Sequence, residues 1–139
     1  MTSRQAAQAE TTGSADAWDL PSQDYHHPDG TMRYVDTGDG PPVVLVHGTP
    51  TWSIEWRHVV KALAPTHRVL APDHLGFGRS TRPANAAYSP EAHARRFADW
   101  AVHLGLAADD HAPAVTLVLH DFGGPIALDW ALQVAASQP

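Results

Sequence analysis

The sequence contains no cysteine among its 139 residues. Disulfide bridges, thiolate catalysis and zinc sites built from cysteine are therefore excluded. The chain also lacks any apolar run long enough to span a membrane, and residues 1–18 are polar and small rather than arranged as a signal peptide. We therefore expect a soluble, cytoplasmic protein with no membrane partner.

Positive charge is scarce as well. The chain has 9 Lys and Arg residues against 15 Asp and Glu residues, a formal net charge of −6, and no basic cluster. We therefore expect no nucleic-acid partner, because nucleic-acid binding needs a surface that follows the phosphates. Residues 76–80 (GFGRS) match neither the dinucleotide nor the phosphate-loop pattern, so no cofactor is expected. His26 and His27 lack the spacing of a helical metal site, so no functional metal is expected.

Length and pattern indicate one small domain after a tail. Residues 1–18 are rich in Ser, Thr, Gln, Ala and Gly, which predicts disorder. Residues 19–139 are enough for a single core. Asp29-Gly30 is a hairpin signal, and Ser89-Pro90 pairs an N-cap with a first helical residue. The expected elements are strands at 23–27, 32–37 and 43–46, a helix at 52–63, a strand at 69–71, a helix from 90 to about 104, a strand at 115–119 and a helix from 125 to about 136.

A hairpin followed by alternating strands and helices is typical of an α/β fold. We predict a three-layer α/β/α arrangement around a mostly parallel sheet, with the hairpin at its N-terminal side. Ligands in such folds bind at the carboxyl ends of the strands. Three distinctive segments follow predicted strands at that edge, namely residues 47–50, 73–76 and 120–122. The pattern therefore predicts a site built from these three segments.

The prediction of this site depends mainly on residues 115–125. Its first half is apolar or β-branched without alternation, which indicates a strand buried on both faces. Asp121 follows, and Pro125 stands where a helix begins. Gly123 and Gly124 have no side chains, so the strand and the helix can approach closely. This pattern is typical of a nucleophile elbow with aspartate in place of serine. The alternative is that Asp121 is an ordinary helix N-cap.

Three segments stand together in order and spacing: 44–53 (VLVHGTPTWS), 71–80 (APDHLGFGRS) and 118–124 (VLHDFGG). Together they resemble the α/β-hydrolase superfamily, in its aspartate-nucleophile branch of haloalkane dehalogenases and epoxide hydrolases. The Pro-Thr-Trp-Ser sequence after His-Gly is similar to the dehalogenases. The resemblance runs from about residue 19 to the last residue.

The resemblance implies a haloalkane dehalogenase type of hydrolase, in which Asp121 attacks a saturated carbon and forms an alkyl-enzyme ester. An ionised carboxylate needs no adjacent base for this attack. The backbone N–H groups of Thr49 and Phe122 would form the oxyanion hole. The expected partner is a small-molecule substrate, a halogenated alkane or an epoxide. The supporting residues are His47, Gly48, Pro50, His120, Gly123 and Gly124. Of these, Pro50 makes the loop rigid, with a cis peptide bond as one form, and the two histidines are expected to hydrogen-bond loops.

Three positions depart from the family pattern. Phe122 stands where members usually have a tryptophan whose indole N–H holds the leaving halide, and phenylalanine has no such donor. Thr49 stands where many members have a halide-binding asparagine. Leu119 is bulkier than the small residue that many hydrolases have there. These departures make an epoxide or an ester the alternative substrate.

In the family, the catalytic acid and the water-activating histidine lie beyond the elbow, after a helical cap. This chain stops at Pro139. We therefore expect the N-terminal half of a hydrolase, truncated after the elbow helix, that forms the ester without full turnover; the non-enzymatic alternative is a truncated remnant. Strand 115–119 would then be an exposed apolar edge available for self-association. His93, His103 and His111 are interpreted as surface residues rather than substitutes for the base.

Overall fold

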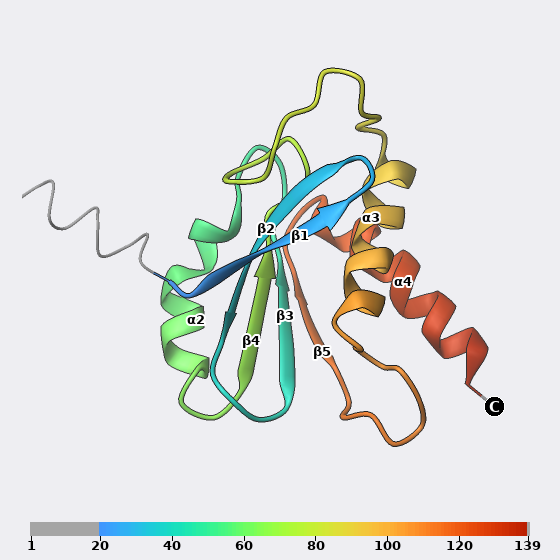
Figure 1. Ribbon diagram of the computed structural model, residues 1–139. Helices are drawn as coiled ribbons and strands as arrows, with labels where there is room; N and C mark the ends of the chain where they lie inside the picture. Colours follow the sequence, from blue (N-terminus) through green and yellow to red (C-terminus); the bar gives the residue numbers. More distant parts are fainter. Residues whose placement is uncertain (1–19, 139) are drawn as a thin grey trace, which may run out of the picture.

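The apolar runs of the sequence assemble into one five-stranded sheet (Figure 1). The computed structural model describes residues 20–138, so the tail predicted for residues 1–18 lies outside the described residues. The strands are β1 (Ser22–His27), β2 (Gly30–Thr37), β3 (Pro42–Val46), β4 (Arg68–Pro72) and β5 (Thr116–Leu119). Their order across the sheet is β1-β2-β4-β3-β5.

The sheet is mixed. β1 and β2 form the antiparallel hairpin predicted around Asp29-Gly30, and β2 also runs antiparallel to β4. β3 pairs in parallel with β4 on one side and with β5 on the other. Parallel neighbours require a crossover connection, and the alternating helices of the sequence supply it. The predicted α/β fold class is therefore confirmed, with the hairpin accounting for the antiparallel pairs.

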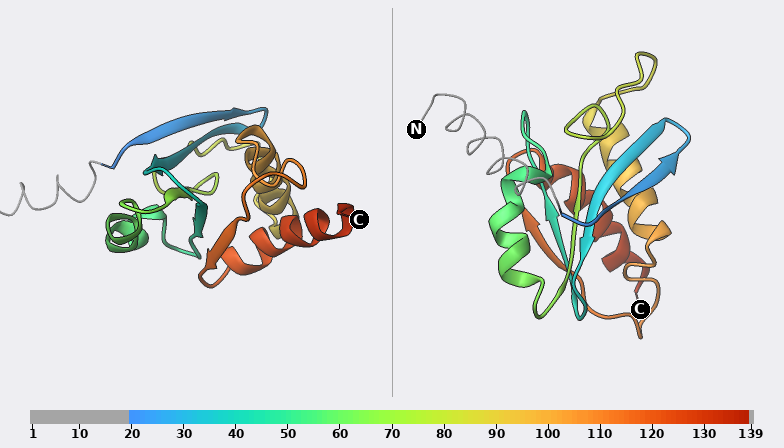
Figure 2. Two further views of the ribbon diagram at one scale, coloured as in Figure 1. Left: turned by 90° about the horizontal axis from the view of Figure 1, so that it is seen from below. Right: turned by 60° about the vertical axis from the view of Figure 1, so that its left-hand side comes forward.

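The helices cover both faces of the sheet. They are η1, a 3-10 turn (Ser53–Trp56), α2 (Arg57–Leu63), α3 (Pro90–His103) and α4 (Gly123–Ser137). α2 lies on one face, and α3 and α4 lie together on the other (Figure 2). The helix predicted at 52–63 is therefore a 3-10 turn followed by a short α-helix. The predicted cap of α3 is present, because the Ser89 hydroxyl accepts from the Ala92 N–H at 3.2 Å.

Alternating side chains of β3 divide the core into two clusters. Val44 and Val46 face α3 and α4, where they pack in the cluster that contains Trp100. Val43 and Leu45 point to the opposite face and pack in the cluster that contains Val60 of α2. This division follows from the two-residue period of a strand with both faces covered, and it gives the three predicted layers.

β5 is the edge strand of the sheet formed by residues 20–138. The prediction that residues 115–119 are buried on both faces is wrong, since Thr116 is exposed and the residues from Leu117 to Leu119 are only half-buried. A strand with a neighbour on one side only has fewer groups covering it, and this explains the difference. Within residues 20–138, no helix is long and apolar enough to cross a membrane.

Candidate active site

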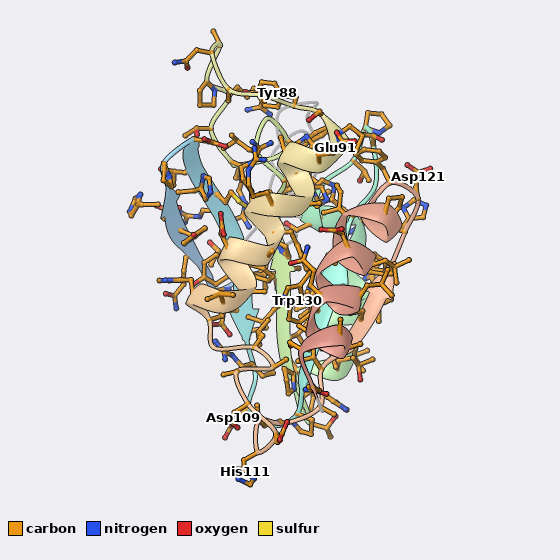
Figure 3. All side chains as sticks on the ribbon, turned by 90° about the vertical axis from the view of Figure 1, so that its right-hand side faces the viewer. Tyr88, Glu91, Asp109, His111, Asp121 and Trp130 are labelled. Atoms are coloured by element: carbon orange, nitrogen blue, oxygen red, sulfur yellow. The ribbon has the colours of Figure 1, made fainter. Side chains whose placement is uncertain are left out.

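The three predicted segments meet at one end of the sheet. β3 and β5 run in register, with Val46 opposite Leu119, so the residues that follow them emerge side by side. β4 ends at the same edge because it is parallel to β3. Figure 3 shows Asp121 at the N-terminal end of α4, at the same end of the molecule as Tyr88. The architecture therefore gathers these segments where α/β folds bind ligands.

Asp121 occupies the sharp turn between β5 and α4. Its φ is 50°, a left-handed conformation that few residues other than glycine adopt. The side chain is exposed. The N-cap residue of α4 is Phe122, and no side chain caps this helix. The structure therefore does not place Asp121 as the N-cap, the alternative weighed from the sequence; it holds the carboxylate at the apex of the strand–turn–helix unit.

Two backbone N–H groups converge on the Asp121 carboxylate. One is that of Phe122, and the other is that of Thr49, whose nitrogen lies 3.3 Å from Oδ2. The Thr49 hydroxyl lies 3.5 Å from the same oxygen. Both N–H groups stabilise the ionised carboxylate, so the pKa of Asp121 lies below its ordinary value. The Phe122 N–H has the larger effect and the Thr49 N–H the smaller. The two donors expected to form the oxyanion hole thus lie together at the carboxylate.

The loop after β3 lies against the elbow. The Thr49–Pro50 peptide bond is cis, one of the forms considered for Pro50. Gly48 is buried, and a Cβ built on it would lie 2.5 Å from the Asp121 Cβ. No real Cβ tolerates that approach, so only glycine lets the Thr49 N–H reach the carboxylate.

The two elbow glycines differ. A Cβ on Gly123 would lie 2.4 Å from the Val46 carbonyl oxygen and 2.7 Å from that of His47, so this glycine allows the close strand–helix approach. A Cβ on Gly124 would meet no atom within 4 Å among the described residues. The packing role predicted for Gly124 is therefore wrong, because its missing side chain would point into open space.

His47 is buried with both ring nitrogens engaged. Its Nε2 accepts from the His74 backbone N–H at 2.9 Å, so Nδ1 carries the proton that is donated to the Gly48 carbonyl at 2.8 Å. The His74 Nε2 lies 3.0 Å from the His47 carbonyl. Burial lowers the pKa of His47, and it lowers that of His74 well below the ordinary value. Both rings are therefore neutral links between the loops after β3 and β4.

His120 lies on the outer side of the elbow. Its side chain is 58% exposed, and its Nδ1 lies 3.1 Å from a carboxylate oxygen of Glu55 in η1. Its backbone N–H donates to the Val46 carbonyl at 3.1 Å. His120 therefore joins the elbow to η1.

Asp73 is the site residue whose role the sequence reasoning missed. It is fully buried, and its carboxylate accepts from the Ser53 N–H at 2.8 Å and from the Arg79 N–H at 2.9 Å. Its own carbonyl accepts from the Ser80 hydroxyl at 2.7 Å. This residue ties together the loops after β3 and β4. Its place directly after a buried strand, before a glycine-rich loop, was the available signal.

A cavity of about 580 Å³ lies beside the elbow. It is lined by Thr49, Gly76, Phe77, Arg82, Pro83, Ala84, Tyr88, His93 and Phe122. The wall is mostly apolar and includes both residues whose N–H groups meet at Asp121. A concave, largely apolar space beside convergent polar groups is the usual form of a small-molecule site.

His93 corrects an expectation from the sequence. The sequence predicts a surface residue, but His93 is only 4% exposed and lines the cavity. The face of α3 that carries Phe97 and Trp100 packs on the sheet, and His93 lies on that face one turn earlier. His103 and His111 are exposed, as expected, and His111 lies at the end of the molecule opposite Asp121 (Figure 3).

Within residues 20–138, no group of three or more His, Asp or Glu side chains is arranged to hold a metal ion. The absence of a cofactor stays a prediction from the sequence.

Comparison with known proteins decides the family. Residues 41–138 match the family model described as the alpha/beta hydrolase fold. The chain belongs to the α/β-hydrolase fold family. Haloalkane dehalogenase 2 of Mycobacterium tuberculosis is 42% identical over 106 residues, which cover 76% of this chain and 35% of that protein.

Two solved structures show the same relationship. A mutant of haloalkane dehalogenase DatA from Agrobacterium tumefaciens C58 matches with a TM-score of 0.71 and 35% identity, over 81% of this chain and 36% of that one. Epoxide hydrolase CorEH matches with a TM-score of 0.72 and 32% identity, over 84% of this chain and 39% of that one. Within that fold family, the chain is therefore similar to haloalkane dehalogenases and epoxide hydrolases. It spans between 35% and 39% of the length of these relatives.

The close approach of the backbone at Gly123 leads to the first prediction. Gly123→Ala should lower the free energy of unfolding by about 2 kcal/mol, since its methyl group would overlap two backbone carbonyls. Gly124→Ala is the matched control and should match or exceed wild type by up to about 1 kcal/mol, because alanine favours the helix. Urea denaturation would measure both. Equal destabilisation by the two variants would contradict the described packing.

The buried histidines generate the second prediction. Burial lowers the pKa of His47 and His74, and that of His93 to about 4. In the unfolded chain, a histidine has a pKa of about 6.5. At pH values between the folded and the unfolded pKa, the unfolded chain therefore binds more protons than the folded chain. The free energy of unfolding has its full value above about pH 6.5 and falls as the pH decreases toward about 4. The loss is up to about 1.4 kcal/mol per pH unit for each histidine.

Urea midpoints measured from pH 7.5 to 4.5 would test this. His74→Gln should flatten the slope, and His58→Gln, on the exposed side of α2, should leave it unchanged. A midpoint that rose on acidification would contradict the prediction.

Proposed function

We propose that this α/β hydrolase has the chemistry of a haloalkane dehalogenase, with Asp121 as the nucleophile. A carboxylate oxygen forms a bond to a saturated carbon, the carbon–halogen bond breaks, and halide leaves with the bonding electrons. The observation that supports this most is the exposed Asp121 carboxylate at φ 50°, with the Thr49 and Phe122 N–H groups aimed at it. Residues in such sparsely populated conformations often lie at active sites, and here the two N–H groups add a second indication.

An epoxide is the second candidate substrate. Phe122 brings no N–H donor for a departing halide, and epoxide hydrolase CorEH is among the similar structures. In this case the Asp121 oxygen bonds to one epoxide carbon, the carbon–oxygen bond breaks, and the ring oxygen takes a proton from water. Both reactions leave an ester on Asp121. The substrate is a small molecule in either case, and the cytoplasmic location stays a prediction.

Hydrolysis of that ester needs a base that activates water. Within residues 20–138, the histidines near the elbow have other partners. His47 uses both ring nitrogens, the Nδ1 of His93 faces Arg96, and His120 pairs with Glu55 outside the cavity lining. We therefore propose that the 139-residue chain forms the ester faster than it hydrolyses it.

The third prediction follows from the proposal that the ester forms faster than it is hydrolysed. Incubation with 1-bromobutane should add one butyl group to Asp121, and 1,2-epoxybutane should add its whole mass, as read by intact-mass and peptide mass spectrometry. Asp121→Asn should form no adduct, and it should fold because asparagine tolerates positive φ. Asp110→Asn, in an exposed loop, is the matched control.

The rate of adduct formation should not change between about pH 6.5 and 8, where protonation of the buried histidines does not yet lower stability, because the lowered pKa keeps Asp121 ionised. An adduct on another residue, or none with either probe, would disprove the proposed nucleophile.

We also propose self-association through β5 as the non-catalytic property of this chain. β5 has a free edge within the described sheet, and α4 beside it exposes Leu128 (49%) and Leu132 (69%). A second copy of β5 would pair with the edge, and the leucines would widen the apolar contact.

The fourth prediction tests this interface. Leu132→Lys should weaken a dimer about tenfold in sedimentation velocity, because burial of the charge is costly. Val102→Lys, an equally exposed position on α3, should not change it. A wild-type chain that stays monomeric at high micromolar concentration would exclude self-association through β5.

A further inference from the structure

His93 is a buried titratable group that the proposed reaction does not use. It is wedged among aromatic rings, with centroid distances of 5.7 Å to His74, 6.0 Å to Phe77, 6.1 Å to Tyr88 and 6.5 Å to Phe122. Three of these four neighbours line the cavity with it. Its ring is therefore held in place next to the residue that follows the proposed nucleophile.

Arg96 determines which nitrogen of His93 carries the proton. Its Nη2 lies 3.1 Å from the Nδ1 of His93, and its Nη1 lies 3.0 Å from a carboxylate oxygen of Asp29. A guanidinium only donates hydrogen bonds and keeps its charge in proteins. The His93 Nδ1 must therefore accept, so the neutral ring carries its proton on Nε2. Burial and the Arg96 charge lower the pKa of His93 to about 4, which agrees with a neutral ring.

The Nε2–H group is left with no partner among residues 20–138, since the described hydrogen bonds of the His93 ring end at Arg96. The rest of the cavity wall offers few donors. The Tyr88 hydroxyl donates to the Pro83 carbonyl at 2.6 Å, and the Thr49 hydroxyl faces Asp121. Arg82 is exposed and donates to the Gly78 carbonyl at 3.0 Å. His93 is therefore the buried donor that a molecule in the cavity would meet.

We propose that His93 is a specificity-determining residue, whose Nε2–H donates to an acceptor oxygen of the substrate, while Arg96 keeps its basic nitrogen from activating water. The inference rests on the proposed function. During epoxide opening, the bonding electron pair moves to the ring oxygen, which His93 hydrogen-bonds and which takes its proton from water. His93 keeps its own proton throughout. A departing bromide also accepts hydrogen bonds, but it is a weaker acceptor than a developing alkoxide oxygen, so a donor there favours the oxygen-bearing substrate.

The first experiment reads the tautomer without any reaction. Long-range proton–nitrogen NMR of the full 15N-labelled chain at pH 7 should show His93 protonated on Nε2 and not on Nδ1. Addition of butanamide, whose carbonyl oxygen accepts but is not attacked, should shift the Nε2 signal. A proton on Nδ1, or no shift at tens of millimolar butanamide, would overturn the proposal.

The second experiment compares two reagents on Asp121. His93→Phe removes the donor, and the rate of adduct formation with 1,2-epoxybutane should fall about tenfold, while the rate with 1-bromobutane stays within about twofold. His93→Gln restores an amide donor and an acceptor for Arg96, so it should recover most of the epoxide rate. His103→Phe is the control on the exposed face of the same helix.

The outcomes separate the two proposals. Equal loss with both reagents, or no recovery in His93→Gln, would show that His93 acts only through the fold and would overturn its role in specificity. If the wild-type chain forms no adduct with either reagent, the nucleophile proposal fails, and the butanamide titration still decides whether His93 donates into the cavity. If His93→Phe does not fold, His93→Gln and the titration carry the test.

Discussion

The site depends on one buried carboxylate, that of Asp73, at the end of β4. A charge without solvent contact is costly unless hydrogen bonds satisfy it. Asp73 meets this condition by accepting from the N–H group of Ser53, the first residue of η1, and from that of Arg79, in the loop after β4. η1 and the loop after β4 are thereby fixed to the end of the central parallel strands. Thr49 precedes Ser53 in the connection between β3 and η1, and its N–H group reaches Asp121.

A second constraint comes from neutral histidines. His47 and His74 exchange hydrogen bonds across the loops after β3 and β4, and His93 packs against His74 in the cavity wall. Neutral rings pack at lower cost than charged ones, and each ring still supplies one donor and one acceptor. The positive charge beside these rings belongs to Arg96, which is buried and paired with Asp29 of the hairpin turn. The hairpin therefore contributes to the cavity although it is remote from it in sequence.

The fold was largely predictable, because its signals are local. The strand at β3, the cap at Ser89 and the turn at Asp29-Gly30 each follow from a few adjacent residues, and the bounds shift by only one or two positions. The misjudged features depend on tertiary partners. β5 lies at the edge of the described sheet, as expected, but its apolar composition also predicted burial on both faces, which it does not have. Gly124 resembles Gly123 in sequence, and only the placement of the Val46 carbonyl distinguishes them. For His93 a signal existed, since it shares the helical spacing of Phe97 and Trp100.

The proposed reaction has two steps, formation of the ester and its hydrolysis, and the fold supports them unequally. Attack on a saturated carbon needs an ionised carboxylate in an exposed, fixed position, and the elbow with its two converging N–H groups supplies this from two strand ends. Hydrolysis of the ester needs a basic nitrogen free to take a proton from water. The histidines close to the elbow are committed to structural hydrogen bonds or, in the case of His93, to Arg96. On this mechanism, the described residues supply the nucleophile of the first half-reaction, and their histidines hold the loops of the site or, in the case of His93, line the cavity rather than activate water for the second.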